Sequence, residues 1–185
     1  MGGKIRFNVA KFGAKVASQV SKFGFGSGNN LPGYVFYKIA GKEALKDLAH
    51  EMSIGPILIT GTNGKTTTTT LLIKLLSADT KIRKSFESNT IHAITTGILK
   101  GDGDLGVFEY GIRNKSYGIP DTVQRLIDPV GVVYTTISRE HSQVAGVKNP
   151  FEEYVDAKSL LSQGMTRGVV ISNADDPVTA KYCLQ

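Results

Sequence analysis

The pattern of hydrophobic residues changes along the chain. Near the start it has a helical period, and after about residue 55 short continuous apolar runs alternate with helical patterns. Within residues 8–23, apolar side chains recur at spacings of three and four: Val9, Phe12, Val16, Val20 and Phe23. This spacing predicts an amphipathic helix, because it gathers the side chains on one helical face. The segment GFGSGNNLPG at 24–33 is rich in turn formers and predicts a loop or linker. A short helix is expected at about 41–51.

From residue 56, short apolar runs alternate with helical patterns. The runs are PILIT at 56–60, LGVFEY at 105–110, VGVVYTT at 130–136 and GVVISN at 168–173. They do not alternate with polar residues, which is typical of parallel strands covered on both faces. Helices are expected up to about 77, at 121–128 with Asp121 as N-cap, and at 150–164. The pattern predicts an α/β fold, a doubly wound and mostly parallel sheet of P-loop type with a short helical N-terminal extension.

Ligands of such sheets bind at the carboxyl ends of the strands, so chemistry is expected after Thr60, at Glu109 and after Thr136. The segment GTNGKT at 61–66 follows the first of these strands and precedes a helix. Its glycines allow backbone N–H groups to face phosphate oxygens, and the helix N-terminus adds its dipole. The loop is shorter than the common G-x-x-x-x-G-K-[ST] form, and the alternative is a βα turn with a chance lysine.

ATP is the ligand that this loop predicts. Lys65 is expected to reach the β- and γ-phosphates, while the Thr66 hydroxyl is expected to bind Mg²⁺. The predicted nucleotide contacts are Gly61, Thr62, Asn63, Gly64, Lys65, Thr66 and Thr67.

Three further residues carry candidate chemistry, although each has an ordinary interpretation when taken alone. Glu109 ends an apolar strand and is a candidate second Mg²⁺ ligand, or else a partner in a strand-end salt bridge. His141 follows a strand and is a candidate metal ligand, or else a structural histidine. Lys158 lies among apolar helix residues and alone would be interpreted as a solvated helix lysine.

Composition narrows the class of protein. The chain has 185 residues, enough for one sizeable core, and its single cysteine excludes a disulfide framework and a cysteine zinc site within one chain. No apolar run approaches the length of a membrane span and no signal peptide is recognisable, so a cytoplasmic protein is expected.

The net charge of +6 is concentrated near the start of the chain. Seven of the 22 Lys and Arg residues lie within residues 1–42, which contain no Asp or Glu, and the remainder is nearly neutral. This distribution argues against nucleic acid, whose recognition needs basic residues across a face of the fold. Two interpretations of the basic helix stay open. Its apolar stripe docks on the domain, or the helix makes peripheral contact with a membrane.

Taken together, the motifs resemble the central ATPase domain of the Mur ligase family. GTNGKTTTT is followed in order by SNTIHAITTG, FEYG, TTISREHSQVAGVKNPFEEYVDAKSLL and VVISNADDP. The family shows a GTNGKT[TS] loop, an [RD]-[DE]-H motif followed by E-x-Y-x-x-A-K, and an NADD turn. The resemblance spans about residues 57–177 and divides the chain into a basic helical segment with linker, 1–54, and a central ATP-binding domain, 55–185.

The resemblance implies an ATP-dependent ligase that adds an amino acid to a cell-wall peptide precursor through an acyl phosphate. It implies that Lys65 and the loop hold the phosphates and that Thr66 and Glu109 hold one Mg²⁺. It also implies that His141 helps to hold a second metal and that Lys158 is carbamylated to help position that metal. Asn89 matches a position that contacts substrate in relatives.

The short basic leader and the phrases EYGIRNKSYGIP and SREHSQVAGVKNPFEEY are most similar to archaeal pseudomurein peptide ligases and to MurT-type ligases lacking the UDP-binding domain. Family enzymes continue well beyond NADDP, so we expect a C-terminally incomplete domain that is not fully active alone. Two alternatives are a non-catalytic nucleotide-binding module and a folylpolyglutamate-synthase-like ligase, whose loop typically reads GTNGKGS.

Overall fold

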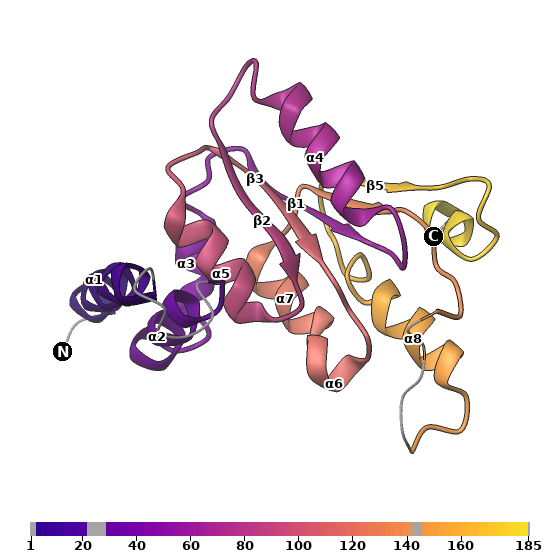
Figure 1. The fold of residues 1–185 in the computed structure, drawn as a ribbon, viewed down its shortest axis with the longest axis horizontal. Helices are drawn as coiled ribbons and strands as arrows, with labels where there is room; N and C mark the ends of the chain where they lie inside the picture. Colours follow the sequence, from indigo (N-terminus) through magenta and orange to yellow (C-terminus); the bar gives the residue numbers. More distant parts are fainter. Residues whose placement is uncertain (1–2, 22–28, 141, 143–145, 185) are drawn as a thin grey trace.

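The computed structural model describes residues 3–21, 29–140, 142 and 146–184. Its centre is a five-stranded parallel sheet in the order β2-β3-β1-β4-β5 (Figure 1). The strands are β1 Gly55–Thr60, β2 Ile82–Ser88, β3 Leu105–Tyr110, β4 Gly131–Tyr134 and β5 Val169–Ser172. The four predicted strands are confirmed, and their parallel pairing brings the carboxyl ends of β1, β3 and β4 to one edge. The expected cover on both faces is wrong for β5, an edge strand on which Val169 and Ile171 are exposed.

Helices cover both faces of the sheet, as the doubly wound prediction requires. Helix α4 (Lys65–Leu76) packs on one face, where Ile73 joins Ile59 and Val107 in a small apolar cluster. The opposite face holds the larger core, which includes Leu58, Phe108 and Val132 of the central strands. That face is covered by α5 (Ile91–Lys100), α7 (Pro120–Ile127) and α8 (Pro150–Ser159).

Strand β2 and helix α5 are among the elements that were not predicted. Strand β2 has the polar sequence IRKSFES and alternates in burial, as an edge strand with one covered face does. Helix α5 follows directly, capped by the Thr90 hydroxyl, which accepts a hydrogen bond from the Ala93 amide. A shift of register between Ser85 and Ser88 bends the end of β2 where it approaches the carboxyl edge of β3.

The N-terminal segment forms α1 (Gly3–Ser21), α2 (Leu31–Ala40) and α3 (Ala44–Ala49). The predicted loop at 24–33 is wrong at its end, because Leu31 to Gly33 open α2; residues 24–28 lie outside the described part. Pro32 is tolerated in the first helical turn, where its missing N–H has no intrahelical partner. At Gly33 an added Cβ would lie 2.0 Å from the carbonyl oxygen of His92, so glycine permits the close packing of α2 on α5.

The predicted docking face of α1 is also wrong. The helix packs on α2 through its small residues Ala10, Ala14 and Ala17, which are buried. The larger apolar residues Val9, Phe12, Val16 and Val20 are exposed. Small side chains allow the two helix backbones to approach closely, and the bulkier stripe is therefore turned outward; Phe23 lies outside the described residues.

Two shorter helices complete the described elements: α6 (Lys115–Gly118) and the 3₁₀ helix η1 (Thr179–Leu184). Asp121 is not the N-cap of α7, because the helix begins at Pro120 and its cap position is Ile119. The carboxylate instead lies in the first turn, where it complements the helix dipole. No helix in the described parts of the chain is long and apolar enough to span a bilayer.

Candidate nucleotide-binding site

The loop after β1 has the backbone conformation that its glycines allow. Gly61 has a φ of 149° and Gly64, at the cap of α4, has a φ of 83°. A Cβ at Gly61 would lie 2.0 Å from Oγ1 of Thr135, so a side chain does not fit there. The loop therefore turns directly from the end of β1 into the N-terminus of α4, and this arrangement can bind an anion.

Lys65, Thr66 and Glu109 meet at the mouth of this loop. The Thr66 hydroxyl donates a hydrogen bond to the Glu109 carboxylate, with 2.8 Å between Oγ1 and Oε2. The Lys65 ammonium donates to the Thr62 carbonyl oxygen at 2.8 Å. Burial lowers the pKa of Lys65, and the nearby Glu109 carboxylate opposes that shift. Glu109 is only 4% exposed and projects from β3, which pairs with β1.

Thr62 connects the loop to two other elements. Its hydroxyl lies 3.1 Å from the Tyr154 hydroxyl of α8 and accepts a hydrogen bond at 3.0 Å from the Ser138 amide. Its amide donates to the carbonyl oxygen of Thr136, just after β4. One buried threonine therefore connects the glycine loop with helix α8 and with the segment that follows β4.

A second group of contacts fixes the outer side of the loop. The Asn63 amide group donates to the Glu140 carboxylate at 2.9 Å. The Thr135 hydroxyl donates to the Asn63 carbonyl oxygen at 2.6 Å. The segment after β4 therefore contacts the loop along most of its length, as expected for two neighbouring parallel strands that end at one edge.

Lys158 reaches the same loop from α8, with its side chain buried. Its ammonium donates to the carbonyl oxygens of Ile112 at 2.9 Å and Gly61 at 3.2 Å, and it lies 4.4 Å from the centre of the Tyr154 ring. Burial, and to a lesser extent the nearby Lys65 ammonium, lowers the pKa of Lys158 to about 7. The solvated-lysine interpretation is therefore wrong for a side chain that is 1% exposed.

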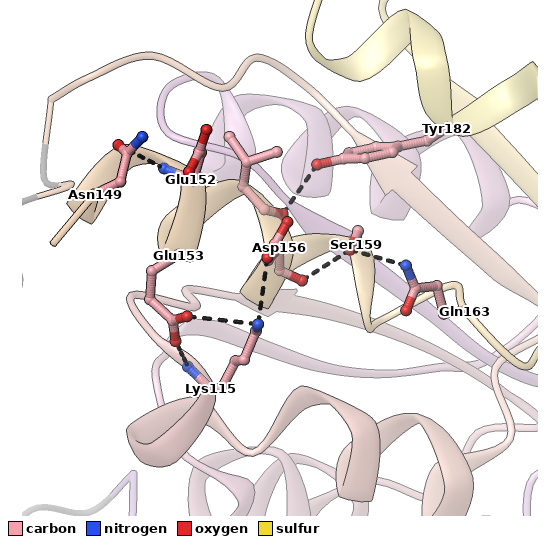
Figure 2. A network of polar contacts seen from close by, with 9 residues as sticks. Lys115, Asn149, Glu152, Glu153, Asp156, Ser159, Gln163 and Tyr182 are labelled. Atoms are coloured by element: carbon pink, nitrogen blue, oxygen red, sulfur yellow. Dashed lines mark hydrogen bonds and ion pairs between the residues drawn. The ribbon is translucent and has the colours of Figure 1, made fainter. Parts of the chain in front are cut away.

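Helix α8 is held in place by the polar network drawn in Figure 2. Lys115 of α6 forms ion pairs with Glu153 and Asp156 at 3.5 and 3.3 Å. The Asn149 side chain accepts a hydrogen bond from the Glu152 amide at the start of the helix. On the other side, the Tyr182 hydroxyl of η1 donates to the carbonyl oxygen of Val155, and together these contacts fix the helix that carries Tyr154 and Lys158.

The remaining predicted residues are placed differently. Asn89 is exposed and follows the last residue of β2. Its side-chain oxygen lies close to Gly111, because a Cβ added at Gly111 would be 2.0 Å from that oxygen. Because Glu109 is only two residues before Gly111 in the sequence, Asn89 and Glu109 lie at the same edge of the sheet. Thr67 is exposed in the first turn of α4. His141 lies outside the described residues, and its predicted metal role stays a prediction.

The sequence did not single out the residues that support the loop after β4. Asp176 of the NADD turn accepts a hydrogen bond from the Ile137 amide at 2.6 Å and so anchors that segment. Beside the loop, an open cavity of about 510 Å³ is lined by Gly64, Thr135, Thr136 and Asn173, among others. Thr135 and Thr136 follow β4 directly and Asn173 follows β5, and this position was the signal available in the sequence, because ligands bind at strand carboxyl ends.

The site suits a magnesium ion in the chemistry of its donors. Thr66 and Glu109 offer a hydroxyl and a carboxylate oxygen side by side, which are hard oxygen ligands of the kind Mg²⁺ prefers. Among the described residues, no three His, Cys, Asp or Glu side chains gather closely enough to hold a metal by themselves. A magnesium ion held by one or two protein groups together with substrate phosphates is consistent with this sparse donor set.

Comparisons with known proteins agree with this geometry. The family model described as the Mur ligase middle domain matches residues 59–184. A UDP-N-acetylmuramoyl-tripeptide--D-alanyl-D-alanine ligase from Bacillus subtilis is 29% identical over 143 residues, which is 73% of this chain and 30% of the relative.

Three solved structures are similar in fold. MurF from Acinetobacter baumannii has a TM-score of 0.63 at 19% identity, over 83% of this chain and 32% of that one. MurF from Thermotoga maritima in complex with ADP has a TM-score of 0.60 at 20% identity, over 76% and 34%. A pseudomurein peptide ligase type C from Methanothermus fervidus has a TM-score of 0.54 at 27% identity, over 69% and 25%.

The chain spans a quarter to a third of the length of these relatives, from 25% of the Methanothermus structure to 34% of the Thermotoga structure. Within that span, the family model covers more than half of the chain and includes the glycine loop, Glu109 and the NADD turn. The chain belongs to the Mur ligase middle domain family.

Proposed function

We propose that this chain is the ATP-binding part of an ATP-dependent ligase that joins an amino acid to a cell-wall peptide precursor. The observation that carries the proposal is the convergence of Lys65, Thr66 and Glu109 on a glycine loop at the mouth of α4. Residues 55–185 form the ATP-binding unit in this proposal, and residues 1–54 form a separate basic segment. The Mur ligase middle domain match supports this chemistry.

Different residues of the loop bind different parts of the nucleotide and its metal ion. Backbone amides between Gly61 and Thr67 contact the phosphates, helped by the dipole of α4. The Thr62 amide is the exception, because it donates to the Thr136 carbonyl oxygen and holds the loop in place. Lys65 leaves the Thr62 carbonyl and pairs with the β- and γ-phosphates, because a charged phosphate is a stronger acceptor than a neutral carbonyl. Thr66 and Glu109 would hold one Mg²⁺, and His141 with a carbamylated Lys158 would help to hold a second. Bound Mg²⁺ supplies neutralisation of the phosphate charge that develops during transfer.

Two bond exchanges follow from this arrangement. A carboxylate oxygen of the precursor attacks the γ-phosphorus of ATP, the bond from that phosphorus to the oxygen of ADP breaks, and an acyl phosphate forms. The amino nitrogen of the incoming amino acid then attacks the acyl carbon, phosphate leaves, and the amine releases a proton to water. We propose that Asn89, at the edge beside Gly111, contacts the precursor during these steps.

Carbamylation of Lys158 is a separate part of the proposal. The lysine nitrogen forms a bond to the carbon of CO₂ and releases a proton, which requires a neutral amine. Burial provides that condition by lowering the pKa of Lys158 to about 7. With ¹³C-labelled bicarbonate, we expect a carbamate carbon signal that is absent from Lys158→Met; an identical spectrum for the two proteins would refute this role.

The partners follow from the same site and from the distribution of charge. ATP, the peptide precursor and the amino acid are the proposed ligands, in a cytoplasmic setting, and we propose no contact with nucleic acid. Seven of the basic residues are concentrated in residues 1–42 rather than spread over a recognition face. This concentration favours an anionic membrane surface as the partner of α1, independently of the nucleotide site.

The test follows one labelled oxygen. The chain, together with the remaining two-thirds of the ligase, is incubated with ATP, Mg²⁺, an amino acid and a precursor whose carboxylate carries ¹⁸O. The acyl phosphate route transfers one ¹⁸O to the released inorganic phosphate. Phosphate released without label, or at a rate independent of precursor and amino acid, would indicate ATP hydrolysis by water and would contradict the ligase proposal. Binding of ATP with no release of phosphate would favour the non-catalytic nucleotide-binding alternative.

A further inference from the structure

Helix α1 presents a row of large apolar side chains to solvent. The row, here named the outer stripe, consists of Ile5, Val9, Phe12, Val16 and Val20. These spacings of three and four place all five residues on one face of the helix. Their exposed fractions range from 43% at Val20 to 70% at Phe12. An apolar face of this length in contact with water is costly unless another surface covers it.

The opposite face of α1 is already occupied. Ala10, Ala14 and Ala17 are buried, and the rings of Phe7 and Phe36 meet edge to face with centroids 5.5 Å apart. The Arg6 side chain donates a hydrogen bond to the Ile39 carbonyl oxygen at the end of α2. The helix is therefore fixed on α2, at one end of the molecule in Figure 1. The side chains of the outer stripe are exposed to solvent.

Charge indicates what covers the outer stripe. Helix α1 contains four basic residues and no acidic one. Lys11 is paired with Glu51 at 2.6 Å and Arg6 with Ile39, but Lys4 and Lys15 form no ion pair with another described residue. Both lysines lie on one flank of the outer stripe, where their long stems can follow an apolar surface while the ammonium groups reach polar headgroups.

We propose that α1 lies on an anionic membrane surface, with the outer stripe in the boundary between headgroups and acyl chains. A helix of 19 residues is about 28 Å long. An exposed apolar face with flanking lysines and no acidic residue matches the pattern of interfacial helices. The same charge pattern disfavours a second copy of the chain, because two basic helices would repel each other. This contact is independent of ligase activity.

A single tryptophan reports the contact directly, because the chain has no tryptophan of its own. Phe12→Trp places the reporter in the outer stripe, and Leu75→Trp places a control on α4 at matched exposure, 70% against 71%. With vesicles of phosphatidylcholine containing about a third phosphatidylglycerol, we expect a blue shift of emission for Phe12→Trp alone. No shift at either position, or an equal shift at both, would overturn the proposal.

Vesicle sedimentation tests the two contributions separately. Phe12→Ser/Val16→Ser should lower the partition coefficient on the same vesicles about tenfold or more, and Lys4→Gln/Lys15→Gln about tenfold, whereas Leu71→Ser/Leu75→Ser should leave it unchanged. Circular dichroism of each variant checks that the exposed substitutions leave the fold intact. Equal binding of all variants would refute the contact, as would a wild-type dimer that Phe12→Ser/Val16→Ser converts to a monomer without any vesicle binding.

Discussion

The Thr66 hydroxyl donates a hydrogen bond to the Glu109 carboxylate across 2.8 Å, although the two residues are 43 positions apart in the sequence. The parallel pairing of β1 with β3 brings them together, since Ile59 lies opposite Glu109 in that ladder. The relationship places a hydroxyl and a carboxylate oxygen beside the glycine loop at the start of α4. Both oxygens are suitable magnesium ligands in an ATP site.

Thr66→Val removes the hydroxyl and nearly preserves the side-chain shape. We expect the affinity for ATP in the presence of Mg²⁺ to fall about tenfold, because one metal ligand is lost. Affinity in EDTA should stay within about twofold of wild type. Isothermal titration calorimetry measures both values. Thr70→Val is the matched control, since its hydroxyl donates to the Thr66 carbonyl one turn further along α4; an equal loss in that variant would contradict a metal role for Thr66.

Lys158→Met tests the buried ammonium through the pH dependence of folding. The folded-state pKa of Lys158, about 7, lies below its ordinary value of 10.5. Between these values the unfolded chain binds more protons, so this lysine makes stability rise with pH. Below pH 7 Lys158 is charged in both the folded and the unfolded state, so the full free-energy cost of burying the charged amine lowers stability.

The free energy of unfolding of wild type minus that of Lys158→Met should therefore rise between pH 7 and pH 9, by up to about 1.4 kcal/mol per pH unit. Urea denaturation at several pH values measures the difference. A difference that is constant or falls with pH would show that the amine is not desolvated in the folded protein.

Tyr154→Phe removes the hydroxyl that lies 3.1 Å from the Thr62 hydroxyl. We expect a loss of about 1 kcal/mol in the free energy of unfolding, the usual contribution of one such hydrogen bond, and weaker binding of ATP by a few-fold. Tyr117→Phe is the control, because that ring is 58% exposed on α6. If the two variants behave alike, Tyr154 does not position the loop.

The sequence indicated the strands that are buried along almost their whole length. Strands β1, β3 and β4 are covered on both faces and appear as continuous apolar runs, and the rule for strand ends placed Glu109 beside the glycine loop. Strand β2 was not predicted because it is an edge strand with one solvent-exposed face, and its sequence is therefore largely polar. The start of α2 was read as a loop because Pro32 and Gly33 are turn formers in isolation.

Other features depend on packing that a pattern does not contain. The stripe containing Phe12 was expected to dock, yet the alanines of α1 do so, because close approach to α2 selects small residues. Lys158 is an ordinary helix lysine by composition, and its burial follows from the position of α8 against Gly61 and Ile112. The link from Thr62 to Tyr154 joins residues 92 apart and likewise requires the three-dimensional fold.

The most direct test of the nucleotide site is the affinity of the chain for ATP with Mg²⁺ in Lys65→Ala, measured by calorimetry beside Lys74→Ala on the same helix. Loss of the ammonium that is proposed to pair with the phosphates should weaken binding about 100-fold, since charge-assisted hydrogen bonds are the strong ones. Lys74→Ala, further along α4, should bind as wild type does. Affinity of Lys65→Ala within about twofold of wild type would contradict the assignment of residues 61–67 as the phosphate-binding loop.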